Sequence, residues 1–182
     1  MKSTEPTRAQ LARRRRERRI VEEARAIAEA DGWAAVTVRR LADAIGFSQP
    51  VLYGHFADGR DGIVRAVALD GFERMASQLE GADGVAEVAA RYLSFARDNP
   101  AAYEAMFSMP IDLAFGTDAT PTSLRRSFAA IERAVSPDAD DRETEAELLW
   151  ATLHGIAELG RHHRLRPSHA ENRIAALVTR SR

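Results

Sequence analysis

The sequence predicts an all-α fold, and three observations carry that prediction. Apolar residues recur at intervals of three and four along almost the whole chain of 182 residues, which is the period of an amphipathic helix. No segment of strand length alternates apolar and polar residues convincingly. Glycine and proline fall between the periodic segments, where they end helices.

Composition excludes several classes of protein. There is no cysteine, which excludes disulfides and cysteine-ligated zinc. With 45% hydrophobic and 29% charged residues, the chain has enough apolar surface to fold. It has neither an uncharged apolar stretch of spanning length nor an apolar region for a secretory signal. We therefore expect a cytoplasmic protein without a membrane partner.

The first predicted helix covers about residues 11–31, and its apolar stripe is made of Ile20, Ala24, Ile27 and Ala28. Gly32 follows, and a glycine here can adopt the left-handed conformation that ends a helix. Trp33 is expected to pack back on the last turn.

Positive charge gathers at the start of the chain. The net charge of −1 divides into +4 over residues 1–60 and −5 over residues 61–182. Arginines occupy positions 13–16, 18 and 19. This run indicates an anion-binding arm, or a solvated helix face paired with Glu17, Glu22 and Glu23.

Two short helices are predicted next. Thr37 is a start signal for the first, whose apolar face is Val38, Leu41, Ala42 and Ile45. Gly46 ends it, and Ser48 with Pro50 begins the second, which carries Val51, Leu52, Tyr53, His55 and Phe56. A pair of short helices joined by a glycine turn, after a longer helix and a basic run, indicates a helix-turn-helix DNA-binding unit.

The segment Thr37-Val-Arg-Arg-Leu-Ala-Asp-Ala-Ile-Gly-Phe-Ser-Gln-Pro-Val-Leu-Tyr-Gly-His-Phe56 resembles the helix-turn-helix signature of the TetR family of transcriptional regulators. The resemblance implies an all-α fold, with a three-helix DNA-binding domain and a larger helical domain that dimerises and binds a small molecule. We place these domains at residues 1–58 and 59–182.

The resemblance also implies the site residues. It assigns Ser48, Gln49 and Pro50 to the start of the recognition helix, and Tyr53 and His55 to DNA contacts. Arg60 stands near the position of a family lysine. The expected DNA contacts are Arg13, Arg14, Arg15, Arg16, Thr37, Arg39, Arg40, Ser48, Gln49, Pro50, Tyr53, His55 and Arg60. Two alternatives stay open: Tyr53 as a core aromatic, and His55 as a cation at a helix C-terminus.

Six further helices are expected, over about residues 59–79, 85–98, 101–108, 122–135, 142–164 and 168–180. Residues 109–121 are expected to form a loop because they hold two prolines and a glycine. The helix over 142–164 is apolar on more than one side, so we expect it to take part in a subunit interface. The expected interface residues are Leu149, Leu153, Ile156, Gly160, Ile174 and Leu177.

Trp150 and His154-Gly155 resemble the Trp-His-Gly motif of one subgroup of C-terminal domains in this family, as does the run from Asn99 to Phe107. An effector pocket is expected among aromatic, methionine and histidine residues. They are Phe95, Tyr103, Met106, Phe107, Met109, Phe128, Trp150 and His154, with Phe115 in the same cluster. The alternative is that these side chains only fill the core.

Catalysis and metal binding are weaker interpretations. His154, Glu158 and His162 are spaced four apart on one helix face, which could suit a metal, but the paired spacing of a zinc hydrolase is absent. The sequence holds no phosphate-binding glycine loop and no nucleophile elbow. We therefore expect no enzyme, no metal and no cofactor.

Together these features predict a homodimeric repressor that binds a pseudo-palindromic operator in double-stranded DNA and releases it when a small-molecule effector binds. The alternative is a DNA-binding protein of the same fold that takes no small ligand and docks another protein.

Overall fold

The computed structural model describes residues 7–111 and 113–180. Within these residues the chain forms nine α-helices and two short 3-10 turns, with no strand. The all-α prediction is confirmed. The chain divides into two compact units, one of residues up to 70 plus 101–111 and one of residues 71–100 plus 113 onward. The functional division at residue 58 remains a prediction.

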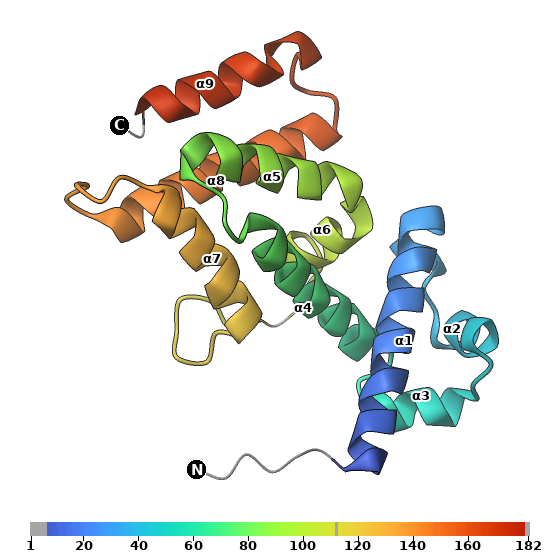
Figure 1. Ribbon diagram of the computed structural model, residues 1–182. Helices are drawn as coiled ribbons and strands as arrows, with labels where there is room; N and C mark the ends of the chain where they lie inside the picture. The colour runs from blue at the N-terminus through green and yellow to red at the C-terminus, as the bar shows by residue number, and fades with distance from the viewer. Residues whose placement is uncertain (1–6, 112, 181–182) are drawn as a thin grey trace. The chain divides into compact units, whose positions relative to one another are not determined.

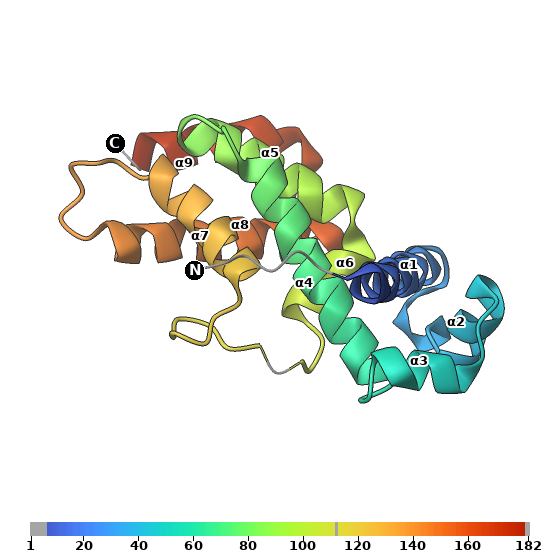
Figure 2. The same ribbon diagram turned by 60° about the horizontal axis from the view of Figure 1, so that its bottom comes forward.

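The first unit contains α1 (Arg8–Asp31), α2 (Val38–Ile45), α3 (Gln49–His55), the first part of α4 (Arg60–Leu79) and α6 (Pro100–Phe107). Figures 1 and 2 show α2 and α3 beside α1. Its core includes Ile20, Ile27, Val36, Leu41, Ile45, Leu52, Ile63 and Tyr103. The stripe predicted for α1 and the apolar face predicted for α2 both supply this core.

Helix α1 begins at Arg8, three residues before its predicted start. The backbone N–H of Gln10 donates to the Thr7 hydroxyl (3.2 Å), and the Thr7 N–H donates to the Gln10 side chain (2.8 Å). This reciprocal capping satisfies two N–H groups that a helix start leaves without partners. It extends the helix by three residues toward the chain start, so the arginine run begins after the first turn of α1.

Trp33 and Glu29 bind the start of α6. The Trp33 indole N–H donates to the carbonyl of Ala101 (3.0 Å), and Trp33 is only 6% exposed. The Glu29 carboxylate accepts from the N–H groups of Ala101 (3.0 Å) and Ala102 (3.3 Å). Because these N–H groups have no partner within the helix, a carboxylate there stabilises the N-terminus of α6.

The second unit contains the rest of α4, then α5 (Gly84–Asp98), α7 (Thr122–Ala134), α8 (Arg142–Arg161) and α9 (Ala170–Arg180). Helix α5 packs against α7, α8 and α9, and α7 packs against α8. The core of this unit includes Phe72, Met75, Leu79, Val88, Tyr92, Phe95, Ile131 and Leu153.

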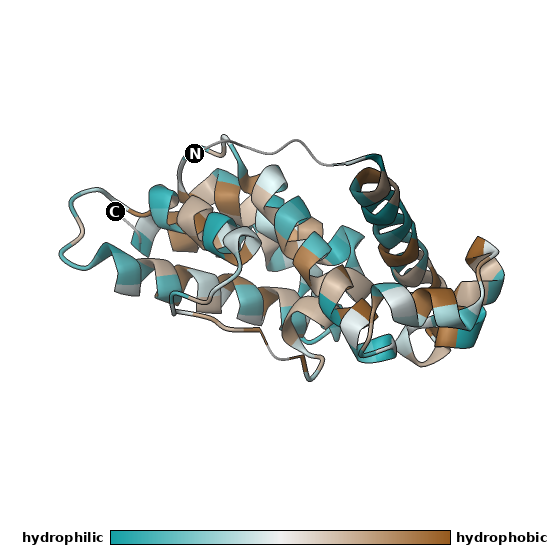
Figure 3. Ribbon diagram, turned by 90° about the horizontal axis from the view of Figure 1, so that it is seen from below, coloured by the Kyte–Doolittle hydropathy of each residue, from teal (hydrophilic) through white to brown (hydrophobic). Residues whose placement is uncertain are grey.

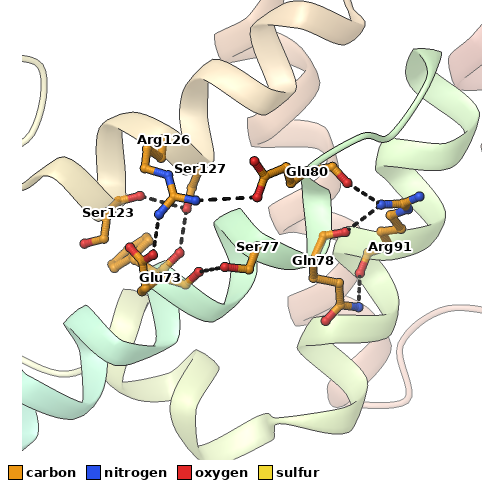
Figure 4. A network of polar contacts seen from close by, with 9 residues as sticks. Glu73, Ser77, Gln78, Glu80, Arg91, Ser123, Arg126 and Ser127 are labelled. Atoms are coloured by element: carbon orange, nitrogen blue, oxygen red, sulfur yellow. Dashed lines mark hydrogen bonds and ion pairs between the residues drawn. The ribbon is translucent and has the colours of Figure 1, made fainter.

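Polar contacts join the end of α4 to α5 and α7 (Figure 4). The guanidinium of Arg126 pairs with the carboxylate of Glu73 and lies 3.7 Å from that of Glu80. Ser127 donates to the carbonyl of Phe72 (2.9 Å). On the α5 side, Arg91 donates to the carbonyl of Gln78 in the last turn of α4 (2.9 Å) and to that of Glu80 just after the helix (2.7 Å). These bonds satisfy acceptors that a helix end leaves open.

Helix α8 ends at Arg161, earlier than the predicted residue 164. His163 adopts a left-handed φ of 54°, which residues other than glycine rarely do, and this stops the helix. A 3-10 turn, Pro167–His169, then precedes α9. No helix among the described residues is long and apolar enough to cross a membrane.

Candidate nucleic-acid interface

The turn between α2 and α3 is built by local backbone chemistry. The Thr37 hydroxyl accepts from the N–H of Arg40 (3.1 Å) and begins α2. Gly46 takes the left-handed conformation (φ 70°), and the N–H of Phe47 returns to the carbonyl of Ala42 (2.9 Å). The chain therefore leaves α2 sharply, and the two helices contact each other as in a helix-turn-helix unit.

Helix α3 presents its N-terminal end to solvent. Ser48, Gln49 and Pro50 are all exposed. The Ser48 hydroxyl makes no capping hydrogen bond among the described residues. Tyr53 is 50% exposed, whereas Leu52 is 1% exposed and anchors the helix. The predicted start of the recognition helix thus forms one accessible surface.

The C-terminal end of α3 is bonded to α1 by polar side chains. The His55 side chain is only 6% exposed, and its Nδ1 lies 3.2 Å from a carboxylate oxygen of Glu17. That same oxygen accepts from Nε of Arg13 (2.9 Å), and Nη2 of Arg13 donates to the carbonyl of Gly54 (3.1 Å). We call these residues, Arg13, Glu17, Gly54 and His55, the α1–α3 clasp. His55 lies in the last turn of α3. This position fits the alternative stated above, in which His55 is a cation at a helix C-terminus.

The arginine run is divided by the geometry of α1. Successive helical residues point about 100° apart, so four consecutive arginines face different directions. All four are exposed, but Arg13 bonds the other residues of the α1–α3 clasp, whereas no ion pair of Arg14, Arg15 or Arg16 is found among the described residues. The guanidinium carbon of Arg19 lies 5.7 Å from the centre of the Phe47 ring, a cation–π distance. The N-terminal turns of α1 are correspondingly hydrophilic (Figure 3).

The remaining predicted contacts also differ in what they touch. Arg39 is exposed, and its Nε lies 4.0 Å from a carboxylate oxygen of Asp43, a distance at which a surface pair is weak. The Arg40 guanidinium is paired with the Asp31 carboxylate across to α1. Arg60 donates to the carbonyls of Val36 (3.0 Å) and Trp33 (2.9 Å), which ties α4 to the turn before α2.

Two residues of this surface, Glu17 and Arg19, are not among the predicted site residues. The sequence presents Glu17 only as a counter-charge, although its spacing of four from Arg13 is a signal for a helix pair. No sequence pattern predicts the cation–π contact of Arg19, because the turn between α2 and α3 is what brings Phe47 near α1. The DNA contacts themselves remain predictions.

The predicted effector residues fall in both compact units. Tyr103, Met106, Phe107 and Met109 belong to the first, and Phe95, Phe128, Trp150 and His154 belong to the second. In the second unit Phe115 stacks on Trp150 with ring centres 4.8 Å apart, and Phe128 meets Trp150 edge-on at 6.1 Å. The Trp150 indole N–H donates to the Tyr92 hydroxyl (3.2 Å). The effector site remains a prediction.

His154 has a perturbed acidity. Burial lowers its pKa below the usual histidine value because desolvation disfavours the charged ring, and Glu158 opposes this effect by attracting that charge. Arg161 adds to the lowering. The described residues hold no group of three or more side chains arranged to bind a metal.

Three of the predicted interface residues, Leu149, Leu153 and Leu177, are buried within the chain, whereas Ile156 and Ile174 are half-buried and Gly160 is exposed. The subunit interface itself remains a prediction. Leu149 and Leu153 are 6% and 0% exposed, and Leu177 on α9 is 8% exposed. On a neighbouring face of α8, Leu148 and Leu159 are 57% and 45% exposed. Because neighbouring helical residues point about 100° apart, the exposed apolar face of α8 is the one beside the predicted set.

Comparison with protein families finds two matches. Residues 20–67 match the family described as bacterial regulatory proteins, tetR family. Residues 85–181 match the tetracyclin repressor-like C-terminal domain. The second match alone covers more than half of the chain. Whether this C-terminal domain belongs to the Trp-His-Gly subgroup stays a prediction.

Relatives agree with these matches. An uncharacterized HTH-type transcriptional regulator of Mycobacterium tuberculosis is 32% identical over 151 residues, covering 77% of this chain and 67% of the relative. The crystal structure of the regulatory protein SCO4313 is similar with a TM-score of 0.72 and 20% identity, over 96% of this chain and 97% of that one. A tetR-family regulator from Rhodococcus RHA1 has a TM-score of 0.62 and 16% identity, over 91% and 96% of the two chains.

The two solved structures are 20% and 16% identical to this chain, so their similarity shows the fold alone. The family matches and the curated relative go further, because they cover both the helix-turn-helix unit and the helices that follow it. This chain therefore belongs to the TetR family of DNA-binding transcriptional regulators, which are not enzymes.

Proposed function

We propose that this regulator represses transcription by binding a pseudo-palindromic operator as a homodimer, and that a small-molecule effector releases it from the DNA. One observation carries the proposal: the N-terminal end of α3 is exposed and accessible while its far end and its apolar face are anchored. A recognition helix needs this combination, because base contacts require both access and a fixed orientation.

On the DNA, Gln49 is the proposed base-reading residue, since its amide can bond an adenine edge bidentately in the major groove. Pro50 makes only apolar contact there. Ser48, Tyr53 and the exposed arginines of α1 contact phosphates, which fix orientation without reading sequence. Arg13, His55 and Arg60 act mainly by holding the helices, because their side chains already bond protein groups.

The homodimer is proposed to form through the exposed face of α8. This face carries Leu148, Ala151, Thr152, Gly155 and Leu159, which recur at helical spacing and are exposed or half-buried. Adding Cβ at Gly155 would meet no described atom within 4 Å, so a second helix has room to approach. Of the other predicted interface residues on α8, Ile156 and Gly160 lie at the edge of this face. Leu149 and Leu153 lie beside it and are buried in the core of the chain.

Effector control is proposed to pass through α4 and α6. Helix α4 runs from the first unit into the second, and α6 is bonded to α1 by Glu29 and Trp33. An effector that prefers one arrangement of these helices shifts the population toward it, and DNA and effector then oppose each other reciprocally.

The test is a DNA-binding titration joined to sedimentation. The wild-type chain should sediment as a dimer, and Leu148→Asp with Leu159→Asp should yield a folded monomer that loses most of its operator affinity. The matched control is Glu147→Asp, an exposed position on the same helix. A wild-type monomer that binds the operator at full affinity would contradict the dimer and would favour a docking surface for another protein.

A further inference from the structure

The second unit contains a pocket of about 510 Å³ that none of the predicted effector residues lines. It lies between α5, α8 and the segment that leads into α9. Its apolar wall includes Leu93, Ile156 and Leu165. The volume falls within the roughly 300–1,000 Å³ range of small-molecule sites.

Every charged side chain of the lining is basic. Arg97 comes from α5, Arg161 from α8 and Arg173 from α9. Positive charge is unexpected here, because residues 61–182 carry a net charge of −5. A pocket that gathers three arginines in an acidic region favours a negatively charged occupant.

Arg173 differs from the other two arginines in its ion pairing. Arg97 pairs with Asp98 (3.0 Å) and Arg161 with Glu158 (3.1 Å). Arg173 pairs with no carboxylate among the described residues, and its Nη1 donates to the carbonyl of Arg166 (3.1 Å). Its buried Nε–H finds no acceptor in the described part of the chain. A buried donor without an acceptor is costly, so an anion here would satisfy a group that the fold leaves open.

His163 brings the end of α8 to this pocket. It lines the same pocket and is the non-glycine residue with a positive φ in the described chain. Its N–H donates to the carbonyl of Gly160 (3.0 Å), and the next N–H, of Arg164, donates to the carbonyl of Leu159 (2.8 Å). These two bonds are those of a helix C-terminal cap on a left-handed residue, so they fix the backbone of the pocket wall directly after α8.

We propose that this pocket binds an organic anion, a carboxylate attached to an apolar chain or ring. Arg173 would bind the carboxylate, which accepts in a fork that matches the guanidinium. Leu93, Ile156 and Leu165 would cover the apolar part. The pocket as a binding site does not depend on the proposed function. The further claim that its ligand is the effector of this regulator rests on that function.

The pocket and the proposed dimer face occupy different sides of α8. Ile156, Ala157, Gly160 and Arg161 line the pocket. At about 100° per residue, Ala157, Gly160 and Arg161 point roughly 100° or more away from Leu148 and Leu159, and Ile156 lies at the border between the two faces. Dimerisation and ligand binding are therefore compatible.

Calorimetry on the full chain tests the site with four probes of defined chemistry. Decanoate and 1-naphthoate carry the carboxylate, while 1-decanol and decylamine keep the chain without it. Both carboxylates should bind, and the alcohol and amine should bind at least tenfold more weakly. Equal binding of decanoate and decylamine would contradict the proposal, as would the failure of both carboxylates to bind at millimolar concentration.

Two variants locate the binding. Arg173→Gln should weaken decanoate binding about tenfold or more, and the control Arg164→Gln removes the same charge from an exposed neighbour outside the pocket. Gly160→Leu should block binding, whereas Gly160→Ala should not, because a Cβ at Gly160 meets no described atom within 4 Å. Equal loss in Arg173→Gln and Arg164→Gln, or full binding by Gly160→Leu, would overturn the assignment.

An operator titration with and without decanoate separates the two proposals. Decanoate binding that leaves DNA affinity unchanged supports the pocket and contradicts effector control by it. Absence of decanoate binding contradicts the pocket, whatever the chain does on DNA.

Discussion

The two ends of α3 both carry polar residues, but these residues differ in their accessibility. At the N-terminal end, Ser48 and Gln49 are exposed and face solvent. At the C-terminal end, His55 is buried against Glu17, and Arg13 holds the carbonyl of Gly54. Polar side chains at the first end are accessible to a partner, and those at the second hold the fold together.

This contrast indicates how a seven-residue helix can serve as a recognition element. A helix this short is not stable alone, so its orientation must come from tertiary contacts. Leu52 and the clasp supply those contacts on the protein side. Substitutions at the anchored side should therefore change stability, and substitutions at the exposed end should change only DNA binding.

The largest expected effect is at the anchor. Leu52→Ala should lower the free energy of unfolding by about 2–5 kcal/mol, because a fully buried side chain leaves a cavity. Val51→Ala is the matched control, since Val51 is 39% exposed, and it should change stability by less than about 1 kcal/mol. Urea denaturation measures both. Equal losses would mean that α3 is not anchored by this face.

The clasp should have the next largest effect. Glu17→Ala removes the carboxylate from buried His55 and from Arg13, so the free energy of unfolding should fall by about 1–3 kcal/mol. Glu22→Ala, at an exposed position on the same helix, should stay within about 0.5 kcal/mol of wild type. Glu17→Gln should restore part of the loss, because its amide oxygen still accepts. If Glu17→Ala is as stable as Glu22→Ala, the clasp contributes nothing to the anchor.

The exposed arginines should affect DNA binding without affecting stability. Replacing Arg14 and Arg15 by alanine should weaken binding to all DNA sequences and reduce the salt slope, by about 0.9 for each phosphate that the variant no longer neutralises. Replacing Arg125 and Arg133, exposed arginines of α7, makes the same change in net charge. An unchanged slope in the first variant, measured by anisotropy at several salt concentrations, would remove the arginine run from the interface.

The smallest expected effect lies in the second unit. Burial lowers the pKa of His154, so on acidification the unfolded chain binds a proton before the folded chain does. Stability therefore falls as the pH drops through the usual histidine range. His154→Asn should make the melting temperature less sensitive between about pH 7 and 5. His162→Asn, at an exposed position, should not; equal flattening by both variants would argue against burial as the cause.

Much of the fold follows from local patterns. The helix-turn-helix unit was predictable because its start and stop signals, Thr37, Gly46 and Ser48, lie within a dozen residues, and its apolar face repeats at helical spacing. The end of α8 was harder to predict. The residues up to 164 suit a helix, and only the backbone conformation of His163 stops it.

Which face of an apolar helix is covered cannot be read from the helix's own sequence. Leu148 and Leu149 are equivalent as residues, yet one is 57% exposed and the other 6%, because α5 and α7 pack against one side of α8. The clasp and the basic pocket were unpredictable for the same reason. Each joins residues that are far apart in the chain, such as Glu17 with His55, and Arg97 with Arg173.

The most direct test of the proposed recognition surface is selection of bound sequences from a random double-stranded DNA library by the wild-type chain and by Gln49→Ala. Wild type should enrich an inverted repeat. Gln49→Ala should lose the preference at one symmetric pair of base positions, at a cost of about 1–3 kcal/mol for the selected site, with unchanged stability and unchanged affinity for other DNA. An identical enriched motif from both chains would contradict the assignment of the exposed end of α3 as the reading surface.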